Sequence, residues 1–138
     1  MILLDTNVIS ELMKPRPEAK VEMWLAAQPR SEIFLSSVTE AELRYGLAIL
    51  PAGQRRQQFE VALDAMLRQD FAGRIIPFDS AAAVTFATIA ADRRRLGRPI
   101  SQMDAQIAAI ARSVGATLAT RNVNDFQDCG ISIVDPWR

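Results

Sequence analysis

Five short apolar runs, separated by segments with helical periodicity, are the feature that most limits the fold of this chain. The runs cover residues 1–4, 33–35, 74–78, 116–119 and 132–134. Uninterrupted apolar runs of this length are typical of parallel strands that are buried on both faces. Strands that alternate with helices predict an α/β fold with a mainly parallel sheet. No linker or repeat interrupts the pattern, so we expect one domain over residues 1–138.

The segments between these runs predict the helices. We expect helices ending near Met13 and covering about 18–27, 38–50, 54–69, 80–96 and 101–114, with a turn or short helix at 122–126. In such folds, ligands usually bind beyond the carboxyl ends of the strands. Polar residues at those ends are therefore the first candidates for a functional site.

The amino-acid composition excludes several kinds of catalytic and metal-binding site. The sequence has no histidine and one cysteine, Cys129, which excludes histidine catalysis, histidine-bound metals and a structural zinc site. Any bound metal must be held mainly by oxygen, as Mg²⁺ or Mn²⁺ is. Lys plus Arg and Asp plus Glu both number 16, which excludes a uniformly basic surface. With neither a signal peptide nor an apolar span in the sequence, we expect a cytoplasmic location.

Three acidic residues stand where an ordinary structural role explains them incompletely. Asp5 ends the first apolar run, where it is equally well placed as a helix cap. Glu42 lies on the helical face of Val38, and Asp104 heads the stripe that continues at Ile107. Surface position and the helix dipole are the simpler explanations, but carboxylates on an apolar face are rare unless they are paired or metal-bound.

The loop after the fourth apolar run supplies two more candidates, Asn122 and Asp125, both of which are also common turn residues. If the acids converge, they repel one another by roughly 4 kcal/mol at about 4 Å and an effective dielectric constant of about 20. A divalent cation or protonation relieves such repulsion. A Mg²⁺ site of this kind usually serves phosphoryl chemistry.

Two arginine clusters, Arg55–Arg56 and Arg93–Arg95 with Arg98, offer local phosphate contacts. Solvated helix faces and a cationic helix end are the simpler interpretation of both. We therefore assign neither cluster to a binding site.

Several segments, in order along nearly the whole chain, resemble PIN-domain ribonucleases, the toxins of VapBC-type toxin–antitoxin pairs, and are most similar to the FitB-like branch. They are Leu3-Leu4-Asp5-Thr6-Asn7-Val8, Ser36-Ser37-Val38-Thr39-Glu40-Ala41-Glu42-Leu43, Gly46-Leu47, Pro99-Ile100, Asp104-Ala105-Gln106-Ile107-Ala108-Ala109, Thr120-Arg121-Asn122, Asp125-Phe126 and Pro136-Trp137. The resemblance implies a five-stranded parallel sheet between helices and a Mg²⁺- or Mn²⁺-dependent endoribonuclease.

The resemblance also assigns roles. Asp5, Glu42 and Asp104 match the family's catalytic metal-binding acids, and Thr6 matches the hydroxyl that orients the first aspartate; Thr120 is a further supporting residue. The family often has a fourth acid where this chain has Asn122. An amide brings no charge to a metal, so Asp125 is a candidate substitute.

The partners that the resemblance implies are RNA as substrate, a second copy of the chain, and a small antitoxin. The antitoxin's C-terminal arm would block the site, and its N-terminal part would bind operator DNA. Independently, the apolar residues of 8–25 and 45–59 exceed what one small core can bury. We therefore expect an exposed apolar groove between these segments, in which such an arm would lie.

Two other functions remain open at this point. A PIN-like module that binds RNA or protein without cleaving it would explain the missing fourth acid. A phosphatase that uses Asp5 as nucleophile is weaker, because the common Asp-x-Asp arrangement has Asn7 at its second position.

Overall fold

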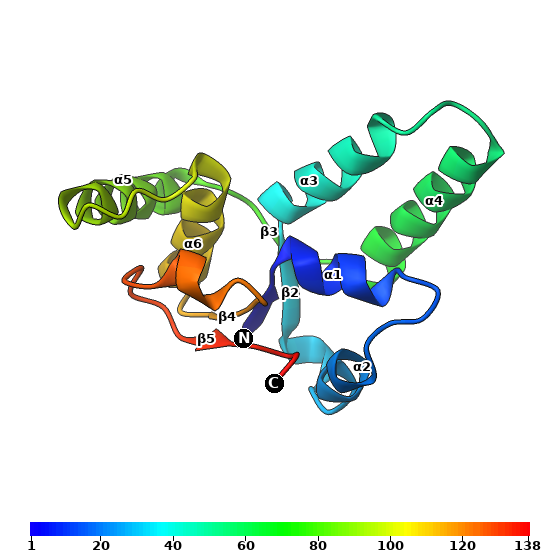
Figure 1. The fold of residues 1–138 in the computed structure, drawn as a ribbon, viewed down its shortest axis with the longest axis horizontal. Helices are drawn as coiled ribbons and strands as arrows, with labels where there is room; N and C mark the ends of the chain where they lie inside the picture. Colours follow the sequence, from blue (N-terminus) through cyan, green and yellow to red (C-terminus); the bar gives the residue numbers. More distant parts are fainter.

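A computed structural model describes residues 1–138 and shows a five-stranded, fully parallel sheet (Figure 1). The strands are β1 (Ile2–Leu4), β2 (Ile33–Ser36), β3 (Ile75–Ile76), β4 (Thr117–Ala119) and β5 (Ile133–Val134), in the spatial order β3-β2-β1-β4-β5. The N-terminal strand β1 is central, with Leu3 opposite Phe34 on one side and Leu118 on the other. The predicted α/β class and parallel sheet are confirmed.

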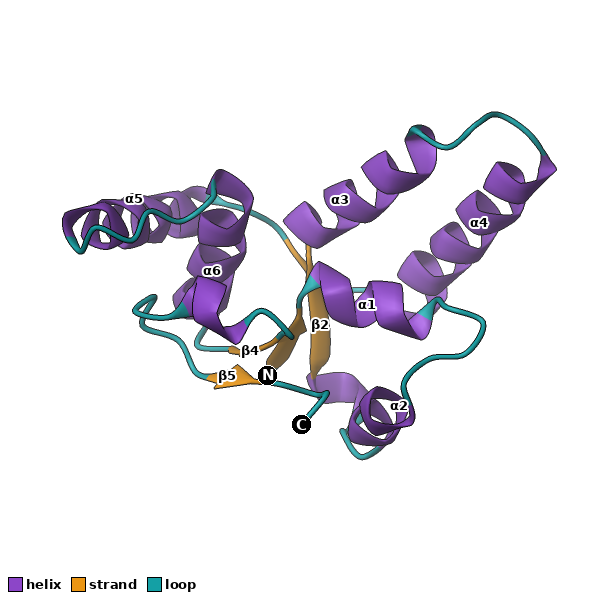
Figure 2. Ribbon diagram, viewed as in Figure 1, coloured by secondary structure: helices purple, strands orange, loops and turns teal.

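The helices are α1 (Thr6–Leu12), α2 (Ala19–Ala26), α3 (Ser37–Ala48), α4 (Gln54–Ala65), α5 (Ser80–Arg95) and α6 (Gln102–Val114), with 3₁₀ turns at Arg30–Glu32 and Val123–Phe126. Figure 2 shows the strands between two groups of helices, α5 and α6 on one side and α1 to α4 on the other. None of these helices has the length and apolar character needed to cross a membrane.

Two separate cores lie on the two faces of the sheet. Leu3 packs in the cluster with α5 and α6, whereas the next residue, Leu4, packs in the cluster with α1 to α4. Alternate strand residues point to opposite faces, so each strand contributes to both cores. Val8 and Ile9, which the sequence suggested as surplus apolar residues, are buried in the second core.

Polar side chains cap the first turns of three helices. The side chains of Asp5, Ser36 and Ser101 accept hydrogen bonds from the backbone amides of Thr6, Thr39 and Asp104 respectively. Each cap satisfies an otherwise unpaired amide in the first turn of its helix. The same caps fix where α1, α3 and α6 begin, and therefore where their polar side chains lie.

Some boundaries differ from the prediction. The helix expected over 54–69 changes at Met66 to a π-helical segment, Met66–Asp70, whose wider turn is closed by the Phe71 amide donating to the Met66 carbonyl at 3.2 Å. The buried Leu67 and Phe71 both face the core there. Ile49 is exposed although the periodicity placed it on the face of Val38, because the α3–α4 hairpin projects away from the sheet (Figure 1).

Candidate active site

A polar cavity of about 430 Å³ lies at the carboxyl edge of the central strands. It is lined by Asp5, Thr6, Asn7, Ser10, Glu11, Lys14, Glu42, Asp104, Arg121, Asn122 and Trp137. Asp5 comes directly from β1, Glu42 from α3 and Asp104 from the first turn of α6. The fold therefore brings together three acids that are far apart in the sequence.

Asp5 is buried, and its carboxylate accepts three hydrogen bonds. Its Oδ1 accepts from the Thr6 amide at 2.8 Å, and its Oδ2 accepts from the Thr120 hydroxyl at 2.8 Å and from Asn7 Nδ2 at 3.4 Å. Burial raises the pKa of Asp5 to about 6, and the carboxylates of Asp104 and Glu42 add to the increase, although the Thr120 and Thr6 hydrogen bonds oppose it. Asp5 is thus a carboxyl group whose anionic form is made less favourable by its surroundings.

Glu42 is held by a hydroxyl from the neighbouring helix. The Thr6 Oγ1 donates to Glu42 Oε1 at 2.8 Å and lies 3.2 Å from the hydroxyl of the buried Thr39. The prediction that the Thr6 hydroxyl orients Asp5 is wrong, since Thr120 supplies that hydroxyl and Thr6 supplies only its amide. Glu42 Oε2 has no hydrogen-bond partner within the chain and is free to bind a ligand.

Asp104 is half-buried at the start of α6. Partial burial raises its pKa, and the negative charge of Asp125 adds to this increase, while Ser101 and the positive charge of Arg93 lower it. The residues that follow on its helical face, such as Ile107 and Ala108, are buried as the spacing predicts. Asp104 therefore combines an apolar setting with a place on the cavity wall.

The two candidates for the fourth position lie in different places. Asn122 lines the acidic cavity, and its backbone N–H donates to the Thr120 hydroxyl at 3.0 Å. Asp125 is exposed and lines a separate polar cavity. Asn122 rather than Asp125 therefore stands beside the three acids, and Asp125 acts on them only through its charge.

Arg93 is a residue whose importance the sequence interpretation missed. Only 4% of it is exposed, so its assignment to a solvated helix face is wrong. Its guanidinium donates to the carbonyl oxygens of Arg98 at 2.7 Å, Asp125 at 2.9 Å and Gln127 at 3.0 Å. The signal was available, because Arg93 continues the buried stripe of α5 at four residues beyond Ile89.

Arg93 joins two loops. One is the α5–α6 turn that leads to Asp104, and the other follows β4 and carries Asn122. Holding carbonyl oxygens with a planar fork of donors fixes both backbones at once. A single buried side chain therefore holds the backbone of the two loops on the Asp104 side of the cavity.

The side chains of the acidic cavity offer suitable ligand atoms for an oxygen-bound cation, but they are not grouped closely. The acids and Asn122 offer only oxygen ligands, and burial together with the charges of Asp104 and Glu42 makes the anionic form of Asp5 unfavourable. However, the chain contains no cluster of three or more acidic, cysteine or histidine side chains grouped closely enough to hold a metal. Mg²⁺ tolerates this arrangement, because it usually keeps several waters and takes one or two carboxylates plus substrate phosphates.

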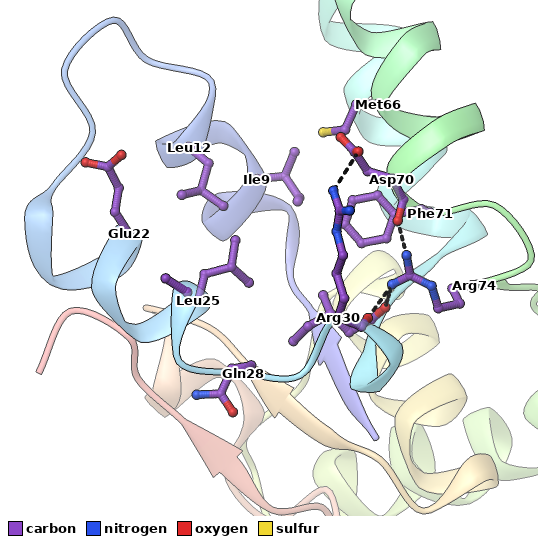
Figure 3. Close-up of a pocket in the computed structure, with 12 residues that line it drawn as sticks. Ile9, Leu12, Glu22, Leu25, Gln28, Arg30, Met66, Asp70, Phe71 and Arg74 are labelled. Atoms are coloured by element: carbon purple, nitrogen blue, oxygen red, sulfur yellow. Dashed lines mark hydrogen bonds and ion pairs between the residues drawn. The ribbon is translucent and has the colours of Figure 1, made fainter.

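Two apolar hollows flank α1. One, of about 270 Å³, runs between α1, α3 and α4 and shares Thr6, Ser10 and Glu42 with the acidic cavity. The other, of about 500 Å³, lies between α2 and the π-helical segment, where Ile9, Leu12 and Leu25 face Phe71 and the Arg30–Asp70 ion pair (Figure 3). Only the smaller hollow lies between the segments for which a groove was predicted, and it involves α1 but not α2. The larger hollow has no residue from the α3–α4 hairpin.

Comparison with known proteins identifies the fold family. The model of the PIN domain matches residues 2–130, which is most of the chain. The chain belongs to the PIN-domain family. Its parallel sheet and the acids at its edge are the arrangement that the sequence resemblance implied.

This PIN domain is similar to VapC-type proteins over almost its full length. It is 43% identical to VapC ribonuclease Y4jK of Sinorhizobium fredii over 99% of this chain and 98% of the relative. It is 39% identical to toxin FitB of Neisseria gonorrhoeae over 99% of each. The structure of FitAB bound to a DNA fragment superposes with a TM-score of 0.94, at 37% identity, over 100% of this chain and 96% of that one. The predicted VapC-type, FitB-like PIN domain is confirmed.

Proposed function

We propose that this PIN domain is a divalent-metal-dependent endoribonuclease and the toxin of a toxin–antitoxin pair in the cytoplasm. One observation carries the proposal: Asp5, Glu42 and Asp104, from three separate elements, line one polar cavity at the carboxyl edge of the sheet. The names of the VapC ribonuclease and FitB toxin relatives support it.

The chain's own residues prepare this cavity for a cation. Thr120 and the Thr6 amide fix both oxygens of Asp5, while the Thr6 hydroxyl fixes one oxygen of Glu42 and leaves the other free. Asp5, Glu42 and Asp104 would hold Mg²⁺ or Mn²⁺. When bound, the cation would polarise the scissile phosphate and lower the pKa of an attacking water.

The partner that we propose is an antitoxin with a C-terminal arm. The similar solved structures of FitAB bound to a DNA fragment and of VapBC-1 from Haemophilus influenzae support a protein partner. The hollow between α1, α3 and α4 leads into the acidic cavity, so an arm lying there reaches the acids directly. A Lys or Arg on the arm would replace the charge of the metal. Operator DNA would bind through the antitoxin.

A homodimer is the remaining part of this proposal. Val84, Leu96 and Met103 are exposed apolar side chains on α5, α6 and the turn between them, and they are candidates for its contacts. Two-fold symmetric dimers are the commonest form of homo-oligomer.

The test is cleavage by the purified chain. We expect a single-stranded RNA to be cut in Mg²⁺ or Mn²⁺, cleavage to stop in excess EDTA, and co-expression with the adjacent antitoxin gene to suppress it. Undiminished cleavage in EDTA contradicts the metal mechanism. Metal-independent binding without any cleavage favours the second candidate, a non-catalytic module, which the amide at Asn122 supports.

A further inference from the structure

Arg121 is a cation at the edge of the acidic cavity, and its positive charge helps to lower the pKa of Glu11 in the same cavity. Its guanidinium lies 5.3 Å over the ring of Trp137, and it forms neither an ion pair nor a side-chain hydrogen bond. Its backbone amide donates to Asn7 Oδ1 at 3.4 Å, and Asn7 in turn donates to Asp5. One side chain thus separates the Arg121 backbone from the acid at the centre of the site.

A second cation lines the same cavity. Lys14 Nζ is bound to the buried Glu11 Oε1 at 3.0 Å, and the other oxygen of Glu11 accepts the Glu18 amide at 3.1 Å. The hydrogen bond from Lys14 keeps the pKa of Glu11 below its usual value. Lys14 is therefore partly neutralised, and Arg121 is the freer of the two cations.

Arg121 also stands between two cavities. Together with Asn122 it lines both the acidic cavity and a second polar cavity of about 590 Å³. The second cavity is also lined by Asp125, Asp135 and Arg138, and Arg138 pairs with Asp135 at 3.6 Å. Arg121 is therefore the cation without an ion pair that both cavities share. A linear ligand that occupies both cavities passes Arg121 and Asn122. Cavities of this size admit a single strand with unstacked bases more readily than a duplex.

An acidic site repels the substrate that it is proposed to cut. RNA carries one negative charge per nucleotide, so the phosphates on either side of the cleaved one meet Asp5, Glu42 and Asp104 unfavourably. The chain has no net charge to offset this repulsion. A local cation beside the acids is the remaining source of attraction.

We propose that Arg121, assisted by Lys14, binds the backbone phosphate next to the cleaved one, and that the RNA strand continues past Arg121 into the second cavity. This inference rests on the proposed function. The five donors of a guanidinium match phosphate oxygens in pairs, and stacking on Trp137 holds the group in place before RNA arrives.

The test measures RNA binding in EDTA, with a gel to show that the RNA stays intact. The probe is a fluorescein-labelled single-stranded RNA, titrated by anisotropy at several salt concentrations. We expect Arg121→Gln to weaken binding about tenfold and to reduce the salt slope by about 0.7, the value for one phosphate contact on a single strand. Lys14→Gln should have a smaller effect in the same direction.

Arg55 provides a matched control. Its guanidinium lies 5.5 Å over the ring of Phe59, also without an ion pair, but on α4 and outside both polar cavities. Arg55→Gln should leave the affinity and the salt slope unchanged. Arg121→Lys should keep the slope and recover part of the affinity, because it keeps the charge and loses the paired donors.

Equal salt slopes for Arg121→Gln and the wild-type chain overturn the proposal. So does a variant that binds RNA normally and loses affinity only for the antitoxin, since Arg121 would then contact a protein carboxylate. If the wild-type chain never cuts RNA in Mg²⁺ or Mn²⁺ but Arg121→Gln still lowers the slope, the proposed function fails and the phosphate contact stands.

Discussion

The two walls of the acidic cavity are held by different chemistry. On the wall formed by β1, α1 and α3, the carboxylates of Asp5 and Glu42 are bound directly by hydroxyls of Thr120 and Thr6. On the opposite wall, Asp104 is placed by the backbone of two loops, and a buried arginine holds that backbone by its carbonyl oxygens. On the first wall the carboxylates themselves are held by hydrogen bonds, whereas on the second wall only the backbone near Asp104 is held.

The difference teaches which kind of change each wall tolerates. Neutral hydroxyl donors orient Asp5 but bring no positive charge, and burial keeps its pKa raised. The ionisation of this wall should therefore change with pH and with bound cations. The Arg93 wall depends on geometry, because its donors bind carbonyl oxygens rather than acids. Substitutions on the first wall should change ionisation. Those on the second should change position, and replacing Arg93 should also raise the pKa of Asp104 further.

Removing the charge of Asp104 should have the largest effect. Asp104→Asn keeps the side-chain volume but removes one of three proposed ligands, and even outer-shell partners of metals are worth about 10- to 100-fold. We expect cleavage to fall by more than about 100-fold with no loss of thermal stability, since repulsion also falls. A folded variant with full activity would reduce Asp104 to a helix-dipole residue.

Ionisation of Asp5 should set the pH dependence of the metal-free chain. Its pKa rises from 3.8 unfolded to about 6 folded, so the folded state binds a proton more tightly between these values. Stability is therefore greatest near pH 4 and declines as the pH rises to about 6, by up to roughly 3 kcal/mol for this group alone. Asp104, whose pKa is also raised, acts in the same direction.

Urea unfolding of the wild-type chain and of Asp5→Asn from pH 4 to 7 checks this. The variant should lose most of the slope, and Mg²⁺ should stabilise the wild type at pH 7 but not the variant. A slope that is identical in both proteins would place the titration on other groups.

Removing Arg93 should damage the opposite wall. Arg93→Met leaves three partly buried carbonyl oxygens without their donor, and a fully buried unsatisfied group costs about 1–3 kcal/mol, so each of these costs less. We expect a net loss of roughly 2 kcal/mol in chemical unfolding, with weaker metal binding by calorimetry. The matched control is Arg94→Met, at the exposed neighbouring position, which should change neither quantity.

The loop after β4 should give the smallest effect. Asn122→Asp adds a fourth acid to the cavity and should tighten Mg²⁺ binding on the order of tenfold. Asp125→Ala should weaken it less, because Asp125 faces the other cavity and acts only through its charge. Calorimetric titration of both variants decides this, and equal affinities in all three proteins would mean that the loop does not influence the metal.

The sequence predicted most of the fold and the three acids, because both depend on local patterns. Apolar runs mark the strands, and a carboxylate on an apolar stripe is visible at Asp104 without coordinates. The hydroxyl partners were predicted less well, since Thr120 and Asp5 are 115 positions apart and meet only through the sheet order. Arg121 and Trp137 were not predicted as a pair for the same reason. Arg93 was visible as part of a stripe, but its charge favoured the wrong interpretation.

The sheet order also decides when the site comes into existence during translation. A nascent chain emerges from the ribosome N-terminus first, and its early segments begin to fold before the later ones are made. Asp5 and Glu42 belong to the first third of the chain, but β1 is flanked on one side by β4, and Asp5 receives its hydroxyl from Thr120. Until β4 has been synthesised, one edge of β1 is unpaired and Asp5 lacks the hydrogen bond from Thr120. The acidic cavity is therefore complete only after β4 has been synthesised, so the function proposed for it begins late in translation.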